Sequence, residues 1–506
     1  MGANDSRPAG QAVADPTLVD PAARPLASPL LRSGGGVTDA DRDRYLYRTD
    51  DGVAVLVELY FTHGFRAARA NFDEIFHATF NGQDVAEPIP IGRRYLRCVL
   101  TEDQVKQLSN AVRSGPRSIF RIWPDFKAIP HIDASVATVK VDAATRSYGT
   151  SGDGIVWAVI DSGIDVTHRH FEVADTLTDE SVATLHRDFT PLLNPRAIAT
   201  DVTDDPKPAL IDASGHGTHV AGIIAGSMPP DQKIVIASNQ PTSEDLPNWT
   251  ERPLDPGRSL SGMAPKARLV SLKVLGEGDH TLSSVVLAAL DYVKNLNVDG
   301  QQVIHGVNIS IGCDWYPDEY AAGQSPLCQA VDDLVNSGVV VVVSAGNNGS
   351  TGTGAMGDIA GRLSTITDPG NAAKAITVGS THRFAPHTYG ISDTSSKGPT
   401  LDGRLKPDLV APGERITSAA TGTLRTGVPP LDAAPGLAAY VEATGTSMSA
   451  AHVSGAVAAF LSVRKEFIGQ PDVIKRLFRE STTSLDRHEF YQGAGMLDLM
   501  RALSNV

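Results

Sequence analysis

Cysteine is scarce in this sequence, which holds three, Cys98, Cys313 and Cys328, among 506 residues. Their number is odd and none stands in a CxxC spacing, so they form neither a disulfide framework nor a zinc-site pattern. Cysteines outside such patterns usually behave as small hydrophobic residues. We therefore predict three buried thiols and no metal bound by cysteine.

Long hydrophobic runs are also missing. The densest run, Val339–Val343, is far shorter than the roughly 20 apolar residues that cross a bilayer. The start of the chain has no apolar stretch of the kind that forms the core of a secretory signal peptide. The sequence therefore predicts no membrane partner and a cytoplasmic location, and it leaves export by a leaderless route open.

Positive charge is in deficit, with 44 Lys and Arg residues against 58 Asp and Glu residues and a net charge of -14. Because nucleic-acid binding depends on Lys and Arg side chains that neutralise phosphates, nucleic acid is excluded as a main partner. The remaining composition, 41% hydrophobic and 20% charged, is typical of a globular protein. A chain of this length predicts more than one module.

Local composition divides the chain into three parts. Residues 1–50 are rich in proline, glycine and alanine, which predicts a disordered tail. Residues 51–130 combine strand and helix patterns, which indicates a small α+β domain built around a β-α-β unit. In this domain Thr101 and Gln104 have the spacing of a helix capping box. Residues 131–506 form a larger second domain.

The second domain has short apolar runs that alternate with helical patterns. Such runs indicate parallel strands that are buried on both faces. The predicted strands are 155–160, 267–275, 306–312, 338–346 and 375–379. The predicted fold class is therefore α/β, with a doubly wound, mostly parallel sheet and helices on both faces. A stretch rich in proline, aspartate and serine, 227–260, is interpreted as a surface insertion.

Polar residues stand where three of these strands end, namely Asp161, Ser310 and Asn347. In open parallel sheets, ligands and catalytic groups gather at the carboxyl ends of the strands. We therefore expect these three side chains to lie near a functional site.

Three further motifs supply an acid, a base and a nucleophile. They are IDSGID at 160–165, SGHGTHVAG at 214–222 and GTSMSAAHVSG at 445–455. Taken singly, Asp161, His216 and Ser447 have ordinary interpretations as helix caps or loop residues. In combination they provide the side chains of a Ser-His-Asp triad, in the chain order Asp, His, Ser.

That order is the one found in subtilisin, and it differs from the orders of chymotrypsin and the α/β-hydrolases. Other segments agree with it. They are GMAPKARLVSLKVL, NISIG, SAGNNG, SSKGPTLDGRLKPDLVAPG and QGAGMLDLMRAL. Residues 145–505 therefore resemble the subtilisin-like serine proteases, or subtilases. The resemblance implies a subtilisin-like fold and a serine endopeptidase that acts on protein or peptide substrates without a cofactor.

The chemistry of peptide hydrolysis gives each residue a role. A serine hydroxyl is a weak nucleophile, so His216 would take its proton as general base, with activity falling below the ordinary imidazole pKa of roughly 6–7. A buried Asp161 would hold the imidazole in the correct tautomer. Ser447, at the start of a helix, would offer a backbone N–H to the oxyanion, and Asn347 would be the second donor.

The resemblance also implies a peptide-binding cleft. Its substrate-binding residues would be Asp279, His280, Thr281, Ser310, Gly312, Ala345 and Gly346. An extended peptide would add as a strand against the segment from Asp279 to Thr281, and Ile366 and Thr367 would lie near the floor of the main pocket. Because backbone pairing of this kind carries little sequence information, we expect broad specificity.

Two parts of the family pattern bear on regulation and metal binding. In this family an acidic residue shortly after the first aspartate motif often binds a structural calcium ion. No such residue is evident here, and His170 lies near that position, so no calcium is predicted there. Residues 51–130 resemble inhibitor-like propeptides. They would assist folding and occupy the cleft as an intramolecular partner until a bond near 126–140 is cut. The alternative is a permanent regulatory or partner-binding domain.

Two alternatives concern the whole protein. An inactive or restrained subtilisin-like protein could serve as a regulatory or binding module, but no triad or oxyanion residue is missing. An α/β-hydrolase esterase would need the motif G-x-S-x-G, and Ser449 stands where its second glycine would be. A serine endopeptidase is therefore the favoured interpretation.

Overall fold

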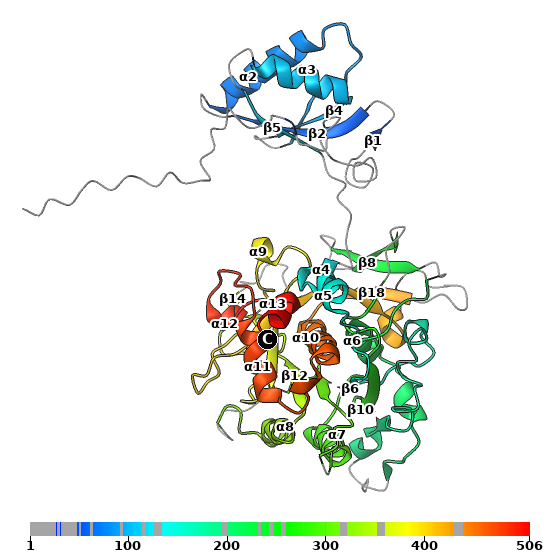
Figure 1. Cartoon of the computed structure of the whole chain (residues 1–506). Coiled ribbons are helices and arrows are strands. Elements are labelled where there is room, and N and C mark those ends of the chain that lie inside the picture. Colours follow the sequence, from blue (N-terminus) through cyan, green and yellow to red (C-terminus); the bar gives the residue numbers. More distant parts are fainter. Residues whose placement is uncertain are drawn as a thin grey trace, which may run out of the picture. The chain divides into compact units, whose positions relative to one another are not determined.

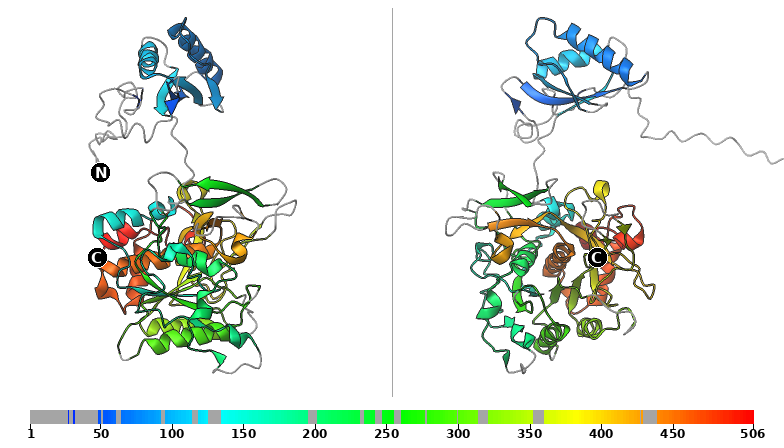
Figure 2. Two further views of the ribbon diagram at one scale, coloured as in Figure 1. Left: turned by 90° about the vertical axis from the view of Figure 1, so that its right-hand side faces the viewer. Right: turned by 180° about the vertical axis from the view of Figure 1, so that it is seen from behind.

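The computed structural model shows two compact units, Met1–Pro130 and His131–Val506, each with its own hydrophobic core (Figures 1 and 2). The described residues are 27, 31, 48–49, 52–60, 64–91, 95–113, 118–124, 134–194, 201–230, 234–241, 247–254, 260–276, 278–298, 300–313, 321–351, 360–426, 428 and 439–506. Most of the predicted tail and much of the linker at 126–140 lie outside them.

The first unit is a small α+β domain with helices α2 and α3 and an antiparallel sheet. Its elements are β1 (Arg48–Thr49), β2 (Gly52–Leu59), α2 (Phe65–Thr79), β3 (Ile89–Ile91), β4 (Tyr95–Leu100), α3 (Glu102–Arg113) and β5 (Ile119–Pro124). Strand β2 pairs with both β4 and β5, so β4, α3 and β5 form a β-α-β unit split by a central strand.

The capping box at the start of α3 is present. The backbone N–H of Thr101 donates to Gln104 Oε1 over 2.9 Å, and the N–H of Gln104 donates to Thr101 Oγ1 over 3.2 Å. Two residues of the predicted tail, Ala27 and Leu31, are buried in the core of this unit, and Ala27 forms a parallel bridge with Ile122. The predicted tail 1–50 therefore contains ordered positions, since Ala27 and Leu31 pack in the core and β1 pairs with β2.

The second unit is organised around a seven-stranded sheet in which all strands are parallel. In spatial order these strands are β16 (Leu409–Glu414), β15 (Ile376–His382), β12 (Val340–Ser344), β11 (Gly306–Ile309), β6 (Val156–Asp161), β10 (Arg268–Lys273) and β7 (Arg187–Asp188). The five predicted strands are confirmed, and β7 and β16 were not predicted.

Helices cover both faces of this sheet, as the predicted fold class requires. The α-helices of this unit in the described residues are α4 (Ala134–Thr138), α5 (Val141–Tyr148), α6 (His216–Ile224), α7 (Ser283–Leu296), α8 (Pro326–Asn336), α9 (Pro386–Tyr389), α10 (Thr446–Val463), α11 (Pro471–Glu480), α12 (Glu489–Gln492) and α13 (Leu499–Ser504). The side chains of β6 alternate between two cores. Trp157 and Val159 pack with α6 and α10, whereas Val156, Ala158 and Ile160 pack with α7 and α8. Figure 1 shows α6 and α10 on one face of the sheet and α7 and α8 on the other.

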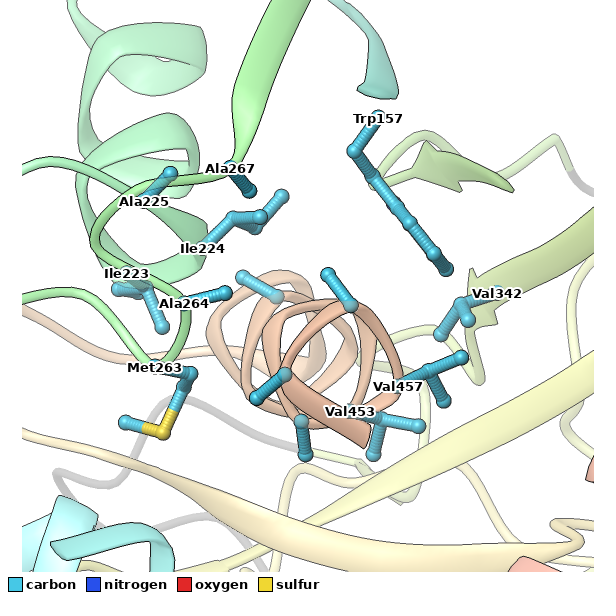
Figure 3. Packing of buried hydrophobic residues seen from close by; sticks show 14 of the residues in the cluster. Trp157, Ile223, Ile224, Ala225, Met263, Ala264, Ala267, Val342, Val453 and Val457 are labelled. Atoms are coloured by element: carbon cyan, nitrogen blue, oxygen red, sulfur yellow. The ribbon is translucent and has the colours of Figure 1, made fainter. Parts of the chain in front are cut away.

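Helix α10 is the central helix of the larger core. Figure 3 shows it surrounded by side chains from separate elements, among them Trp157 of β6, Val342 of β12 and Ile223 of α6. Among the helices of the described residues, α10 alone is long and apolar enough to cross a membrane, but 83% of it is buried inside the protein. Its hydrophobicity is accounted for by this burial.

A second sheet contains two strands from the stretch interpreted as an insertion. Strands β8 (Val235–Pro241) and β9 (Pro247–Pro253) form a hairpin, and β8 pairs in parallel with β18 (Ala439–Ala443), which pairs with β17 (Ile416–Ala419). The interpretation of 227–260 as a surface insertion stays a prediction, and the structure adds that β8 pairs with β18. Because β8 supports the strand that leads into Ser447, this stretch belongs to the framework of the candidate site.

Candidate active site

Asp161 and His216 meet at the carboxyl end of the central sheet. Asp161 is the last residue of β6, which lies between β10 and β11 in the sheet. After β10 the chain passes to the other side of β6 and continues with β11, so β6 lies where the strand order reverses. His216 is the first residue of α6. The Nδ1 atom of His216 lies 2.7 Å from Oδ1 of Asp161, whose side chain is 1% exposed. This geometry is that of an imidazole N–H donating to a buried carboxylate.

Two glycines permit this close approach. Gly215, the residue before α6, has φ of 90°, a conformation that glycine adopts without strain. A Cβ atom on Gly217 would lie 2.2 Å from the carbonyl oxygen of Gly163 and 3.1 Å from Cβ of Asp161. A larger residue at position 217 would therefore push the helix away from β6.

A second carboxylate, Asp212, holds the start of α6 in place. Its Oδ1 accepts hydrogen bonds from Ser162 Oγ at 2.9 Å and from the N–H of Gly215 at 2.8 Å. Its Oδ2 accepts from the N–H and the Oγ1 of Thr218, at 2.8 and 2.6 Å. Sequence reasoning missed Asp212, because nothing in a glycine-rich loop distinguishes a buried helix-capping carboxylate from an exposed one.

These charges set the basicity of His216. Burial lowers its pKa, but the charge of Asp161 and the hydrogen bond to it act in the opposite direction. The charges of Asp212 and Asp279 add to this effect, and together they raise the pKa of His216 to about 9. The site therefore stabilises an imidazolium strongly. Of the predicted substrate-binding residues, Asp279 is the one that acts electrostatically on His216.

Ser447 is the second residue of α10, and its hydroxyl lies against the end of β11. Its Oγ donates to the carbonyl oxygen of Ser310 over 3.2 Å, and Ser310 Oγ donates to the carbonyl oxygen of Ser447 over 3.3 Å. Asn308 supports this pair, since its Nδ2 donates to Ser310 Oγ and its Oδ1 accepts from Ser454 of α10. In this structure the hydroxyl of Ser447 is thus bonded to Ser310 and not to His216.

Asn347 lies beside the start of α10. Its Oδ1 accepts hydrogen bonds from the backbone N–H of Thr446 at 3.0 Å and from Thr446 Oγ1 at 3.1 Å. Because a backbone N–H can only donate, this contact fixes which end of the amide is the oxygen. The Nδ2 group lies near Gly445, ahead of Ser447, and is left as a donor. The N–H of Ser447, in the first turn of α10, is a second donor without an intrahelical partner.

Three of the predicted pocket residues come together around Thr367. A Cβ atom on Gly312 would lie 2.4 Å from Thr367 Oγ1, and one on Gly346 would lie 2.6 Å from the same atom. The carbonyl oxygen of Ala345 accepts from the N–H of Thr367 over 3.1 Å. Thr367 therefore stands between the two predicted walls and occupies space that a smaller residue would leave open.

The segment from Asp279 to Thr281 is irregular and forms no strand. Asp279 has φ of 56°, and the N–H of Gly276 donates to the carbonyl oxygen of His280 over 3.0 Å, which closes a turn. Asp279 itself is not extended, and pairing of a peptide with His280 and Thr281 stays a prediction. The turn remains near the site through the charge of Asp279 on His216.

The three cysteines differ in burial. Cys98 and Cys328 are buried, as predicted, whereas Cys313 is only partly buried, and no disulfide joins the three. Burial raises the pKa of the Cys98 thiol to about 12. Within the described ranges, no group of three or more His, Cys, Asp or Glu side chains is arranged to hold a metal ion.

Comparison with known proteins places this site in a family. The model of the Subtilase family matches residues 152–496. The chain belongs to the subtilase family. It is therefore a serine-type endopeptidase, that is, a hydrolase, and the match spans the strands, loops and helices that carry Asp161, His216, Asn347 and Ser447.

Curated subtilases show the same relationship. Subtilisin E of Bacillus subtilis (strain 168) is 28% identical over 359 residues, which are 71% of this chain and 68% of that protein. The subtilisin of Bacillus pumilus is also 28% identical over 359 residues, 71% of this chain and 94% of its own. Serine protease AprX of Bacillus subtilis (strain 168) is 27% identical over 359 residues, 68% of this chain and 71% of its own. A crystal structure of a cold-adapted subtilisin-like serine proteinase covers 70% of this chain and 91% of its own, with 22% identity and a TM-score of 0.45.

Proposed function

We propose that this subtilase hydrolyses peptide bonds through an acyl-enzyme on Ser447, with His216 as general base and Asp161 as the residue that orients it. The observation that carries the proposal is the 2.7 Å contact between His216 Nδ1 and the buried Asp161 carboxylate. That contact leaves Nε2 of the imidazole as the free basic atom. A buried acid that fixes one ring nitrogen is what a general base needs in order to present the other to a nucleophile.

The first step transfers the Ser447 proton to His216. The hydroxyl exchanges its hydrogen bond to the Ser310 carbonyl for one to Nε2 as the substrate binds, since catalytic hydrogen bonds often form only in the complex. The oxygen attacks the peptide carbonyl as the imidazole accepts the proton. The imidazolium then returns the proton to the leaving amine, and water repeats the sequence on the acyl-enzyme.

The negative oxygen of the tetrahedral intermediate is stabilised by two donors that stand ready beforehand. Asn347 Nδ2 is one, because Thr446 holds the other end of the amide. The Ser447 N–H at the start of α10 is the other, and the positive end of the helix dipole adds to it. Because the donors are held by the fold, little reorganisation is needed when the charge develops.

The proposed substrate is an extended protein or peptide segment with broad sequence tolerance. The pocket for the residue before the scissile bond lies between Gly312 and Gly346, with Thr367 between these walls. Because the side chain of Thr367 occupies part of that space, the pocket favours small and medium side chains over large aromatic ones.

The proposed role of the first unit is that of an intramolecular inhibitor and folding aid, with a split β-α-β sheet as its scaffold. In this proposal the chain is cut within 126–140 and the unit then leaves the cleft. A permanent regulatory domain is the alternative, and it predicts that no such cut occurs.

The experiment that tests the proposed function is labelling with a fluorophosphonate probe, which reacts with an activated serine. We expect the parent protein to be modified at Ser447, as located by peptide mass analysis, and His216→Ala to react far more slowly. Ser447→Ala is the control for modification elsewhere. The linker of the parent protein is also cleaved by an added protease and the labelling is repeated. A folded parent that stays unlabelled both before and after this cleavage would favour an inactive binding module instead.

A further inference from the structure

A lysine is buried beside the loop that carries Asn347. Lys397 is 3% exposed, and its ammonium group donates three hydrogen bonds to backbone carbonyl oxygens. These belong to Gly349 at 2.9 Å, Asp393 at 2.7 Å and Ser395 at 3.0 Å. An ammonium has three N–H groups, so this cage satisfies it completely. The ring of Tyr491 lies 5.6 Å from the nitrogen and covers it further.

The cage consists of dipoles, and no carboxylate in the described part of the chain forms an ion pair with Lys397 within 4.0 Å. Burial lowers the pKa of Lys397, and the charge of Asp393 offsets this effect only in part. Keeping a charged group there therefore costs free energy that the three carbonyl groups must offset. A cluster of converging backbone carbonyls is a site that favours a cation, and here the cation is part of the chain.

The position of the cage links it to the oxyanion donor. Gly349, whose carbonyl oxygen binds the ammonium, lies two residues after Asn347. A Cβ atom on Gly349 would lie 2.4 Å from the Lys397 nitrogen and 1.9 Å from the carbonyl oxygen of Ser395. The loop therefore lies directly against the cage, and position 349 must remain glycine for this contact to form.

Further hydrogen bonds join the same two loops. The N–H of Ser396 donates to the carbonyl oxygen of Gly346 over 2.9 Å, and Ser396 Oγ accepts from the N–H of Asn348 over 3.0 Å. The N–H of Gly349 donates to the carbonyl oxygen of Thr394 over 2.9 Å. Residues 346–349 are thus held along 394–397, and the ammonium is the one charged contact in this set.

We propose that the ammonium of Lys397 is a built-in cation that positions Asn347 for binding the oxyanion. The ammonium of Lys397 contacts three backbone carbonyls and the ring of Tyr491, so we assign it as a positioning residue and not a catalytic one. It acts through the backbone of the loop that carries Asn347, while Thr446 sets the rotation of the amide. The inference rests on the proposed function, since it assumes that Asn347 is an oxyanion donor.

The test combines substitution with chemical rescue. Lys397→Ala removes the cation and leaves a cavity lined by the three carbonyl groups. We expect kcat per labelled active site to fall about 10-fold or more, and KM to stay within about 2-fold, because the lost interaction belongs to the transition state. Added n-propylammonium should restore part of kcat by returning an ammonium to the cage. Tetramethylammonium, which has the same charge but no N–H donor, should not.

Two variants separate positioning from a general structural effect. In an Asn347→Ala background, Lys397→Ala should cause little further loss of kcat, because the group it positions is already gone. Lys475→Ala is the matched control, since Lys475 also donates to two backbone carbonyls, of Ala373 and Ala375, away from this loop. It should reduce stability without lowering kcat per labelled site.

If Lys397→Ala fails to fold, Lys397→Met, which keeps the chain length without charge, takes its place in the kcat measurement and in the Asn347→Ala background. An unchanged kcat, or an equal loss with and without Asn347, would overturn the inference while the proposed function stands. A parent protein that the fluorophosphonate probe does not label would overturn the proposed function itself. The two failures are therefore distinguishable.

Discussion

Three carboxylates act on the imidazole of His216, and only one of them touches it. Asp161 forms the hydrogen bond, Asp212 lies behind the start of α6, and Asp279 acts from an exposed turn. Their summed negative charge outweighs burial and raises the pKa of His216 to about 9. The structure therefore predicts a midpoint above the ordinary imidazole pKa that the sequence alone suggested.

The first prediction concerns the pH profile. Because a protonated imidazole cannot accept the serine proton, kcat/KM should rise with pH and reach half its maximum well above 6.5, the ordinary histidine pKa. Asp212→Asn removes a negative charge that favours the imidazolium, so the pKa of His216 falls and the acid limb moves to lower pH. Rates normalised to labelled Ser447 measure this.

Asp279→Asn is the control for that prediction. Asp279→Asn should also move the midpoint of the pH profile to lower pH. Because Asp279 is exposed, this shift should become smaller at high salt, whereas the shift caused by Asp212→Asn should persist because Asp212 is buried. A midpoint that stays in place in Asp212→Asn would contradict the electrostatic account.

The second prediction concerns Thr367 and the size of the pocket. Thr367→Gly removes the side chain that lies between Gly312 and Gly346, so substrates with a large aromatic residue before the scissile bond should gain. We expect their kcat/KM, relative to alanine substrates, to rise by roughly 10-fold or more. Thr367→Ser, which keeps the hydroxyl, should change the ratio less. An unchanged ratio in the glycine variant would place the pocket elsewhere.

Among the secondary-structure elements, the strands that sequence reasoning missed are those whose apolar character is interrupted. Strand β16 contains Pro412 and Gly413, and β8 lies in a stretch rich in polar residues. Both form strands by pairing with other segments of the chain: β16 pairs with β15, and β8 pairs with β18. Strands such as β12, which contains consecutive valines, are recognisable from their own apolar residues and were predicted.

A buried ion pair holds the start of β16 against β15. Lys406 Nζ lies 2.7 Å from Asp408 Oδ2, and Lys475 lies 3.1 Å from Oδ1. Asp408 also accepts from the N–H of Thr377 in β15. Burial alone would raise the pKa of Asp408, but the two lysines lower it overall. The stability that this pair contributes is therefore present above the pKa of an unfolded aspartate and is lost as pH falls through the lowered one.

The third prediction tests this pair. Asp408→Asn leaves the Lys406 ammonium buried without a charged partner, so the free energy of unfolding should fall by about 3–5 kcal/mol. Denaturant unfolding of the Ser447→Ala protein, which avoids self-digestion, measures it. Asp472→Asn, which removes the exposed partner of Lys374, should cost about 1 kcal/mol or less. Equal effects would show that burial of the first pair does not matter.

On the scale of the whole molecule, the chain joins a small split β-α-β unit to a subtilase unit by a segment that includes 125–133. The family match begins at residue 152, so it does not include the first unit. The role of that unit as inhibitor and folding aid is therefore a proposal about this chain, and it needs its own test.

The fourth prediction is that the protein cuts itself. Intact mass analysis should show the parent chain cleaved at one bond within 126–140, and Ser447→Ala should remain whole, because only the parent has the nucleophile. Addition of the active parent to Ser447→Ala tests cleavage between molecules. Full-length protein in both samples would support a permanent regulatory domain.

The sequence alone was sufficient to determine the family, the α/β class and the strands of continuous apolar residues. These features are local or lie in short motifs, as with Ser447 in the first turn of a helix and the capping box of Thr101 and Gln104. The periodicity of apolar residues and the order of the motifs are visible in the sequence, without knowledge of which segments contact one another in the fold.

Only the tertiary structure decided which buried polar groups face one another. It brought Asp212 under the start of α6, Thr367 between two glycines, and the ammonium of Lys397 into a cage of two carbonyls from its own loop and one from Gly349. In the sequence, Asp212 and Lys397 look like any exposed aspartate or lysine, and for Thr367 the family resemblance indicated only a position near the pocket floor. Their roles arise because hydrogen bonds and charges become strong only when folding removes water and sets the partners within about 3 Å.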